Sequence, residues 1–89
     1  MGFFLGGSAY TMASGIADGV HVVTDRTFRP MSRTELDQMT QELDKHLREI
    51  RGEQAPTEDI AAIQHRNRKI QRLTTALVIL RAHRQKRRI

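Results

Sequence analysis

The side chains most able to bind a charged ligand are five cations within the last nine residues. They are Arg81, Arg84, Lys86, Arg87 and Arg88. Closely spaced Lys and Arg side chains can neutralise the phosphates of a nucleic acid, and such contacts weaken as salt rises. The cluster therefore predicts contact with a polyanion. No aromatic residue lies among these cations to stack on bases, which favours a helix that docks on a protein partner over one that reads a nucleic acid.

Residues that could catalyse a reaction or bind a metal lack the required spacing. The chain has no Cys, and Gly6-Gly7-Ser8-Ala9-Tyr10 lacks the second Gly of a nucleophile elbow. The four His residues, at positions 21, 46, 65 and 83, do not follow the spacings typical of metal ligands. We therefore expect no enzyme activity, no metal, no cofactor and no small-molecule substrate.

The size of the chain points to protein partners. A single core in 89 residues is marginal unless a disulfide, a metal or a partner adds stability. The absence of Cys excludes disulfides, and only four residues are aromatic. We therefore expect a homo-oligomer or a subunit of a larger complex.

Charge is divided unevenly along the chain. Residues 32–59 hold eight acidic and four basic side chains, whereas residues 60–89 hold nine basic and no acidic ones. Such asymmetry indicates either that the two segments pair with each other or that the basic one binds an external polyanion.

A helix is predicted over residues 32–51. Ser32-Arg33-Thr34-Glu35 has the pattern of a capping box, and Pro30 disfavours an earlier start. The helix should end near Gly52. Its apolar residues recur every three or four positions and form one stripe: Leu36, Met39, Leu43, Leu47 and Ile50.

A second, longer helix is predicted over residues 57–86, with Thr57 as its N-cap. Its a/d-type stripe is Ile63, Arg66, Ile70, Leu73, Leu77 and Leu80. The short connection around Gly52 and Pro56 predicts that the two helices fold back as an antiparallel helical hairpin, a small coiled coil. Because the second helix is longer, residues 78–89 should overhang as a basic end.

An apolar block lies inside the second helix. Within residues 76–80 every face of the helix is apolar, so Val78 and Ile79 point away from the predicted seam. Something other than the first helix must cover them. A partner chain is one candidate and the apolar N-terminal segment is the other, so the predicted docking residues are Phe3, Phe4, Leu5, Val78 and Ile79.

The N-terminal 31 residues allow two interpretations. Asp18-Gly19 is a typical hairpin dipeptide and Val20-His21-Val22-Val23 is β-prone, so residues 11–26 could form a short β-hairpin behind a Gly-rich arm. The alternative is a helix over residues 8–17 that ends at Gly19. We favour a strand at residues 20–25 and treat residues 1–31 as a unit separate from the helical hairpin at 32–89.

Residues 18–50 resemble part of a known family. The order of Asp18-Gly19, the β-prone Val20 to Val23 and the Ser32-x-x-Glu35-Leu36 helix is similar to the second half of the small head-to-tail joining proteins of tailed phages. The resemblance covers about a third of the chain, which lacks the family's long helix before the strands. It implies a virion connector subunit that lies close to packaged DNA.

Together these features predict a mainly α, non-enzymatic structural subunit, plausible as a phage virion connector. The alternative is a basic nucleic-acid-binding module. No apolar run approaches the roughly 20 residues that a membrane span requires. The uncharged first 17 residues lack the basic region of a cleavable signal, so we expect a cytoplasmic or virion location.

Overall fold

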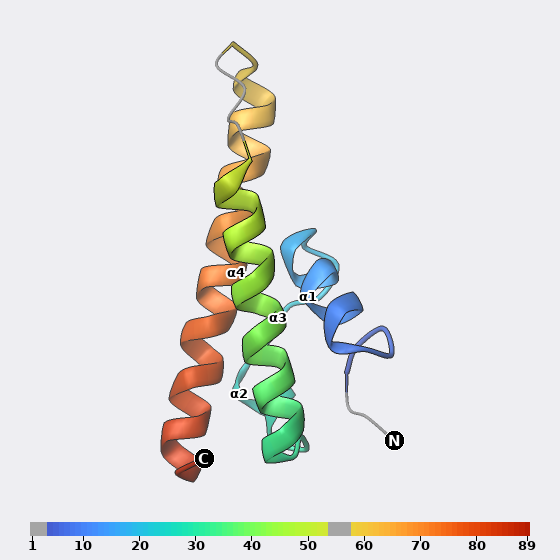
Figure 1. Ribbon diagram of the computed structural model, residues 1–89, viewed down its shortest axis with the longest axis vertical. Helices are drawn as coiled ribbons and strands as arrows, with labels where there is room; N and C mark the ends of the chain where they lie inside the picture. The colour runs from blue at the N-terminus through green and yellow to red at the C-terminus, as the bar shows by residue number, and fades with distance from the viewer. Residues whose placement is uncertain (1–3, 54–57) are drawn as a thin grey trace.

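Helices make up most of the described part of the computed structural model, which covers residues 4–53 and 58–89. The elements are α1 (Ala9–Ala17), α2 (Asp25–Phe28), α3 (Arg33–Gly52) and α4 (Ile60–Arg87). Helices α3 and α4 run antiparallel along the long axis, while α1 and α2 pack against the lower part of this hairpin (Figure 1). The predicted helical hairpin is therefore present.

Helix α3 begins and ends where the sequence predicts. The Ser32 hydroxyl accepts from the Glu35 backbone N–H at 3.2 Å, and the Glu35 carboxylate accepts from the Ser32 N–H at 2.9 Å. This capping box satisfies two N–H groups that the first helical turn would otherwise leave unpaired. The predicted stripe faces the core, with Leu36, Met39 and Leu43 fully buried.

Helix α4 begins at Ile60 instead of residue 57. Asp59 is its N-cap, and its carboxylate accepts from the Ala62 N–H at 3.1 Å. The predicted cap, Thr57, lies outside the described residues. The buried face of α4 is confined to its C-terminal half and consists of Leu73, Ala76, Leu77, Leu80 and His83.

The predicted overhang of residues 78–89 is wrong, because the longer helix projects at its other end. The C-terminus of α4 lies beside the start of α3, and the first turns of α4 extend beyond the end of α3 (Figure 1). Arg84 binds Asp37 in the second turn of α3 at 2.6 Å, and Arg87 donates to the Met31 carbonyl at 3.0 Å. These contacts fix the register at the C-terminal end of α4, so its extra turns fall next to the interhelical connection.

The favoured β-hairpin at residues 11–26 is also wrong, and no strand occurs in residues 4–53 or 58–89. The alternative helix is confirmed as α1. Ser8 caps it by accepting from the Thr11 N–H at 3.1 Å. Gly19, with φ of 80°, ends it in a Schellman motif in which the Val20 N–H donates to the Gly15 carbonyl at 2.8 Å. Residues 21–24 are extended and unpaired, and α2 follows.

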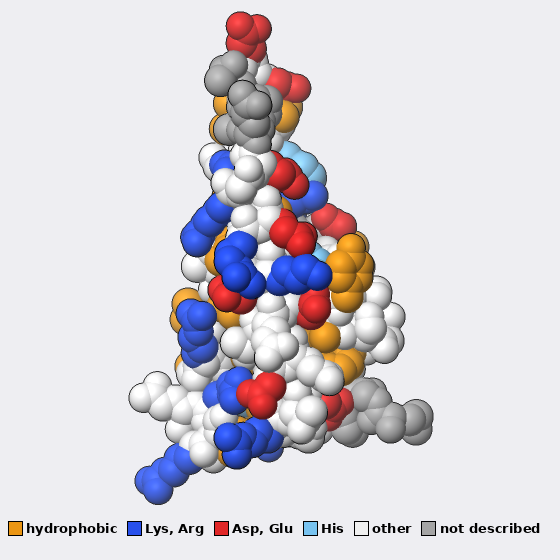
Figure 2. All heavy atoms as spheres, viewed as in Figure 1, with side chains coloured by type: hydrophobic (Ala, Val, Ile, Leu, Met, Phe, Trp, Pro, Cys, Tyr) orange, Lys and Arg blue, Asp and Glu red, His pale blue; other side chains and the backbone are white. Residues whose placement is uncertain are grey.

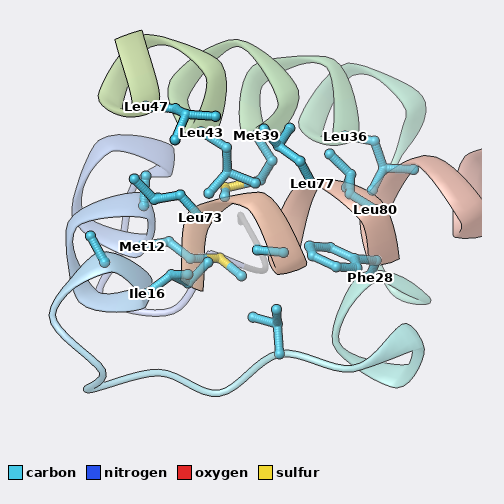
Figure 3. Packing of buried hydrophobic residues seen from close by; sticks show 14 of the residues in the cluster. Met12, Ile16, Phe28, Leu36, Met39, Leu43, Leu47, Leu73, Leu77 and Leu80 are labelled. Carbon is cyan, nitrogen blue, oxygen red and sulfur yellow. The ribbon is translucent and has the colours of Figure 1, made fainter. Parts of the chain in front are cut away.

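Residues 9–17 form helix α1, and not one strand of the predicted β-hairpin, because their apolar residues have helical spacing. Met12 and Ile16 are buried on one face, and Ala13 and Ala17 flank them. Residues from α1 and α2 point at the buried face of α4 and complete one shared core (Figure 3). The residues between Ala9 and Met31 are therefore part of the same core as the hairpin.

Two close approaches fix the loop after α1. The His21 ring packs so tightly on Gly15 that a Cβ there would lie 2.2 Å from its Cδ2 atom. The Arg72 guanidinium lies over Gly19 and donates to the Ala17 carbonyl at 3.0 Å. The Gly15 to Gly19 spacing thus serves contacts within the chain.

Candidate interaction surfaces

Of the predicted N-terminal docking residues, Phe4 packs inside the chain and Leu5 is partly exposed. Phe3 lies outside the described residues. Phe4 is half-buried against the core. The Leu5 N–H donates to the Met12 sulfur at 3.4 Å, and Leu5 is 40% exposed. Phe4 therefore offers a partner little free apolar area, whereas the Leu5 side chain remains available.

The two predicted docking residues of α4 differ in how far they are exposed. Ile79 is half-buried and packs against the core cluster. Val78 remains 60% exposed. The apolar block therefore has cover on every face except the one that Val78 occupies.

Two further valines are exposed in the loop after α1, and the sequence did not predict their exposure. Val20 and Val22 are 73% and 85% exposed, and Val22 borders a hollow of about 410 Å³ between residues 19–23 and α4. Ile16, Val23 and Ala76 form its apolar lining, with Arg72 and Thr75 on the α4 side. Val78 lies one helical turn beyond Thr75, on the neighbouring helix surface. We call Val20, Val22 and Val78 the valine surface.

Val20 and Val22 were not predicted as docking residues, because their β-propensity predicted a paired strand. Their alternation with His21 and Val23 was the available signal. In the structure the alternation survives without a partner strand: Val20 and Val22 are exposed, His21 is half-buried and Val23 is buried.

Three of the five predicted polyanion-binding cations are bound within the chain. Arg84 donates to Asp37, to the Thr40 hydroxyl at 3.2 Å and to the Ile89 carbonyl. Arg87 donates to the Met31 carbonyl, and the Lys86 ammonium lies 3.4 Å from an Asp25 oxygen. These three side chains therefore hold the end of α4 in place.

Arg81 and Arg88 differ from the other three cations. Both are exposed, and neither side chain has a hydrogen bond or an ion pair with any residue in the described part of the chain. With Arg84 they line a shallow groove, which we call the basic groove. Its full lining is Thr40 from α3 and Arg81, Arg84, Gln85, Arg88 and Ile89 from the end of α4.

A hydrogen bond between a buried histidine and a partly exposed aspartate joins α2 to α4. His83 is 2% exposed, and its Nδ1 lies 2.9 Å from the Asp25 carboxylate. Its Nε2 lies 3.1 Å from an Arg87 N–H, which fits a ring that donates through Nδ1 and accepts at Nε2. The hydrogen bond from His83 lowers the pKa of Asp25 to about 2, with smaller contributions from Arg29 and Lys86. No nucleophile accompanies the pair in these contacts, and its place is structural.

On the face shown in Figure 2, acidic side chains are spread along the length of the molecule and include its uppermost groups, whereas Lys and Arg lie over the middle and lower parts. Glu58 and Asp59, which precede α4, are exposed. Glu53, which follows α3, is exposed beside a hollow that Asp18 and Lys69 also line.

Comparisons with known proteins assign the chain to no family. No family model, no curated protein and no solved structure matches it. Among the described residues, no helix is long and apolar enough to cross a membrane, and no three His, Asp or Glu side chains are placed to hold a metal ion.

Proposed function

We propose that this protein is a non-enzymatic structural subunit that docks on protein partners through its valine surface. The observation that carries the proposal is the exposure of Val20, Val22 and Val78, of which Val22 lines an apolar hollow, in a chain with few apolar side chains to spare for its core. Several exposed apolar side chains near an apolar hollow commonly mark an interaction site.

The energies favour apolar docking over attraction by the basic end. Full burial of one Val side chain contributes about 1.5–3 kcal/mol. An exposed ion pair contributes about 0.2–1 kcal/mol. The three valines together therefore outweigh what Arg81 and Arg88 could add by simple pairing.

The first test compares the mass of the full chain in solution before and after the valine surface is made polar. We expect a sedimentation mass above 10.2 kDa for the wild type and a return to 10.2 kDa for the Val22→Asn, Val78→Asn double variant. Asn adds no charge, and both sites are exposed, so helix content should not change.

The matched control places Asn at two exposed positions near the start of α4, Ala61 and Gln64, which are far from Val78 along the helix. This control variant should keep the wild-type mass. An unchanged mass in the Val22→Asn, Val78→Asn variant would reject the proposal.

Nucleic-acid binding is the second candidate, and Arg81 and Arg88 are the residues of the tail that favour it. Both guanidinium groups are exposed without partners in the described part of the chain. Against this candidate, Arg84, Lys86 and Arg87 already bind groups within the chain. The virion connector setting that the phage resemblance implies remains part of the proposal and would accommodate either role.

A further inference from the structure

The net charge of the chain belongs to one end of the molecule. Residues 25–37 and 81–89 hold eight Lys and Arg side chains against three acidic ones, whereas the rest of the chain holds seven of each. The whole formal charge of +5 therefore lies in these two segments, which we call the cationic end. They meet at the lower end in Figure 1, where α2 and the start of α3 lie beside the C-terminus of α4.

Direct contacts hold the two segments of the cationic end together. Arg84 donates to the Asp37 carboxylate at 2.6 Å. Arg87 donates to the Met31 carbonyl at 3.0 Å. Perpendicular to its long axis the molecule measures 24 × 19 Å, so this end is narrower than one helical turn of duplex DNA is long, about 34 Å. One turn of a duplex could therefore span the cationic end.

Four arginines of the cationic end have no partner. They are Arg26 in α2, Arg33 at the start of α3, and Arg81 and Arg88 in the basic groove. All four are exposed, and none of their side chains has a hydrogen bond or an ion pair with any described residue. The other four cations of this end bind groups within the chain. The four arginines therefore carry the charge that the fold leaves free.

Arg88 occupies a position that favours glycine. It follows α4 with φ of 61° and ψ of 40°, in the left-handed region that an L side chain adopts only at an energetic cost. Glycine is the usual residue at such a helix end, because it adopts this conformation without strain. An arginine whose side chain binds no described residue does not repay that cost within the chain. Binding of an external group would account for it.

We propose that the cationic end binds the phosphate backbone of a nucleic-acid duplex through Arg26, Arg33, Arg81 and Arg88. A guanidinium group donates two parallel N–H bonds to phosphate oxygens, and all four free cations are arginines. The cationic end has no exposed aromatic side chain to stack on single-stranded bases, so binding should not depend on base sequence. The inference rests on the nucleic-acid candidate above and is independent of docking through the valine surface.

A phosphate backbone fits the cationic end better than a membrane or an acidic protein does. None of the large apolar side chains exposed in the described part of the chain belongs to residues 25–37 or 81–89. Amphipathic helices on membranes bury apolar side chains among the lipids, and protein interfaces have an apolar centre. The cationic end thus offers charge without apolar surface, which is sufficient for binding phosphates.

Fluorescence anisotropy with a short DNA duplex tests the proposal. The end variant replaces the four free arginines by Gln: Arg26→Gln, Arg33→Gln, Arg81→Gln and Arg88→Gln. The matched control replaces four exposed cations elsewhere whose side chains have no partner among the described residues: Lys45→Gln, Arg48→Gln, Arg51→Gln and Arg68→Gln. Both variants lose four positive charges, so they separate a defined site from overall attraction. All are made in the Val22→Asn, Val78→Asn background, so that docking through the valine surface does not contribute.

Four phosphate contacts predict that the affinity of the background protein falls about 150-fold between about 0.05 M and 0.2 M salt. The control variant should keep this salt dependence, and the end variant should bind at least about 100-fold more weakly at 0.05 M salt. Two partial variants, Arg26→Gln with Arg33→Gln and Arg81→Gln with Arg88→Gln, should each lower the slope of log affinity against log salt by about 1.8. Two duplexes of different sequence should bind equally.

Arg88→Gly separates binding from stability at a single position. Glycine adopts the left-handed conformation without strain, so this variant should melt no lower than the background protein. Its salt slope should nevertheless fall by about 0.9, because one phosphate contact is lost. Circular dichroism measures the melting temperature and should show unchanged helix content in the end and control variants.

The inference is overturned if the control variant loses as much affinity as the end variant, because binding would then follow net charge. It is also overturned if Arg26→Gln with Arg33→Gln leaves the affinity unchanged, since the site would not extend beyond the basic groove. Binding to phosphatidylserine vesicles that the end variant loses, without binding to the duplex, would assign the cationic end to a membrane surface instead. None of these results changes the sedimentation mass that tests the valine surface.

Discussion

The two halves of α4 share one apolar spacing and have different surroundings. In the C-terminal half, Leu73, Leu77 and Leu80 are almost completely buried. In the N-terminal half, Ile63 and Ile70 are only half-buried, although they continue the same stripe. The difference arises because α1 and α2 add a further layer to the later part of α4, where Lys69 pairs with Asp18, Arg72 donates to the Ala17 carbonyl and His83 contacts Asp25. The heptad-like spacing thus predicts which α4 residues face another helix, but the depth of their burial depends on how many helices pack against them.

The difference in burial between the two halves of α4 predicts that its C-terminal half contributes most to the stability of the fold. Leu80→Ala should lower the free energy of unfolding by about 2–5 kcal/mol, because it leaves a cavity at a fully buried site. The matched change in the other half, Ile63→Ala, should cost about 1 kcal/mol or less. Urea denaturation of both variants checks this difference, and equal losses would show that the two halves are equally packed.

A second comparison uses two glycines in helices. Gly15→Ala should destabilise the fold by about 1–3 kcal/mol, because its Cβ would overlap the His21 ring. Gly52→Ala at the end of α3 meets open space and should stabilise by up to about 1 kcal/mol. Thermal denaturation monitored by circular dichroism measures both changes. A stabilising Gly15→Ala would contradict the close packing of His21 on α1.

The smallest effect concerns the hydrogen bond between His83 and Asp25 that joins α2 to α4. The folded-state pKa of Asp25, about 2, is below the ordinary value of 3.8. A lowered pKa means that the carboxylate stabilises the fold above pH 3.8 and that this contribution is lost as the pH falls from 3.8 to about 2. The melting temperature of the wild type should therefore fall through this range more than that of Asp25→Asn. Parallel curves for the two proteins would show that the His83 contact does not contribute.

The sequence was sufficient for the elements that are specified locally. The capping box at Ser32 and the stripe from Leu36 to Ile50 predicted α3, and the breaker at Gly52 placed its end. Helix α1 was favoured less than a strand, because the β-prone Val20 to Val23 outweighed the cap at Ser8. In the structure, burial of Met12 and Ile16 in the core stabilises the helix. The β-prone residues 20–23 do not form a strand, because no partner strand lies beside them.

The candidate surfaces were harder to predict, because they depend on which chain segments meet. The sequence grouped Arg81, Arg84, Lys86, Arg87 and Arg88 as one free cluster. Asp25 on the unpredicted α2 and Asp37 on α3 bind two of these side chains, and the Met31 carbonyl binds a third. The position of the overhang could not be predicted either, since hairpin register follows from these same contacts and not from connection length.

The most direct test of the account is the sedimentation mass of the full chain at several protein concentrations, measured beside the Val22→Asn, Val78→Asn variant. The account predicts a wild-type mass that exceeds 10.2 kDa and rises with concentration, and a substantially lower mass for the variant. A wild type that remains at 10.2 kDa at every concentration, with the same value for the variant, would contradict it.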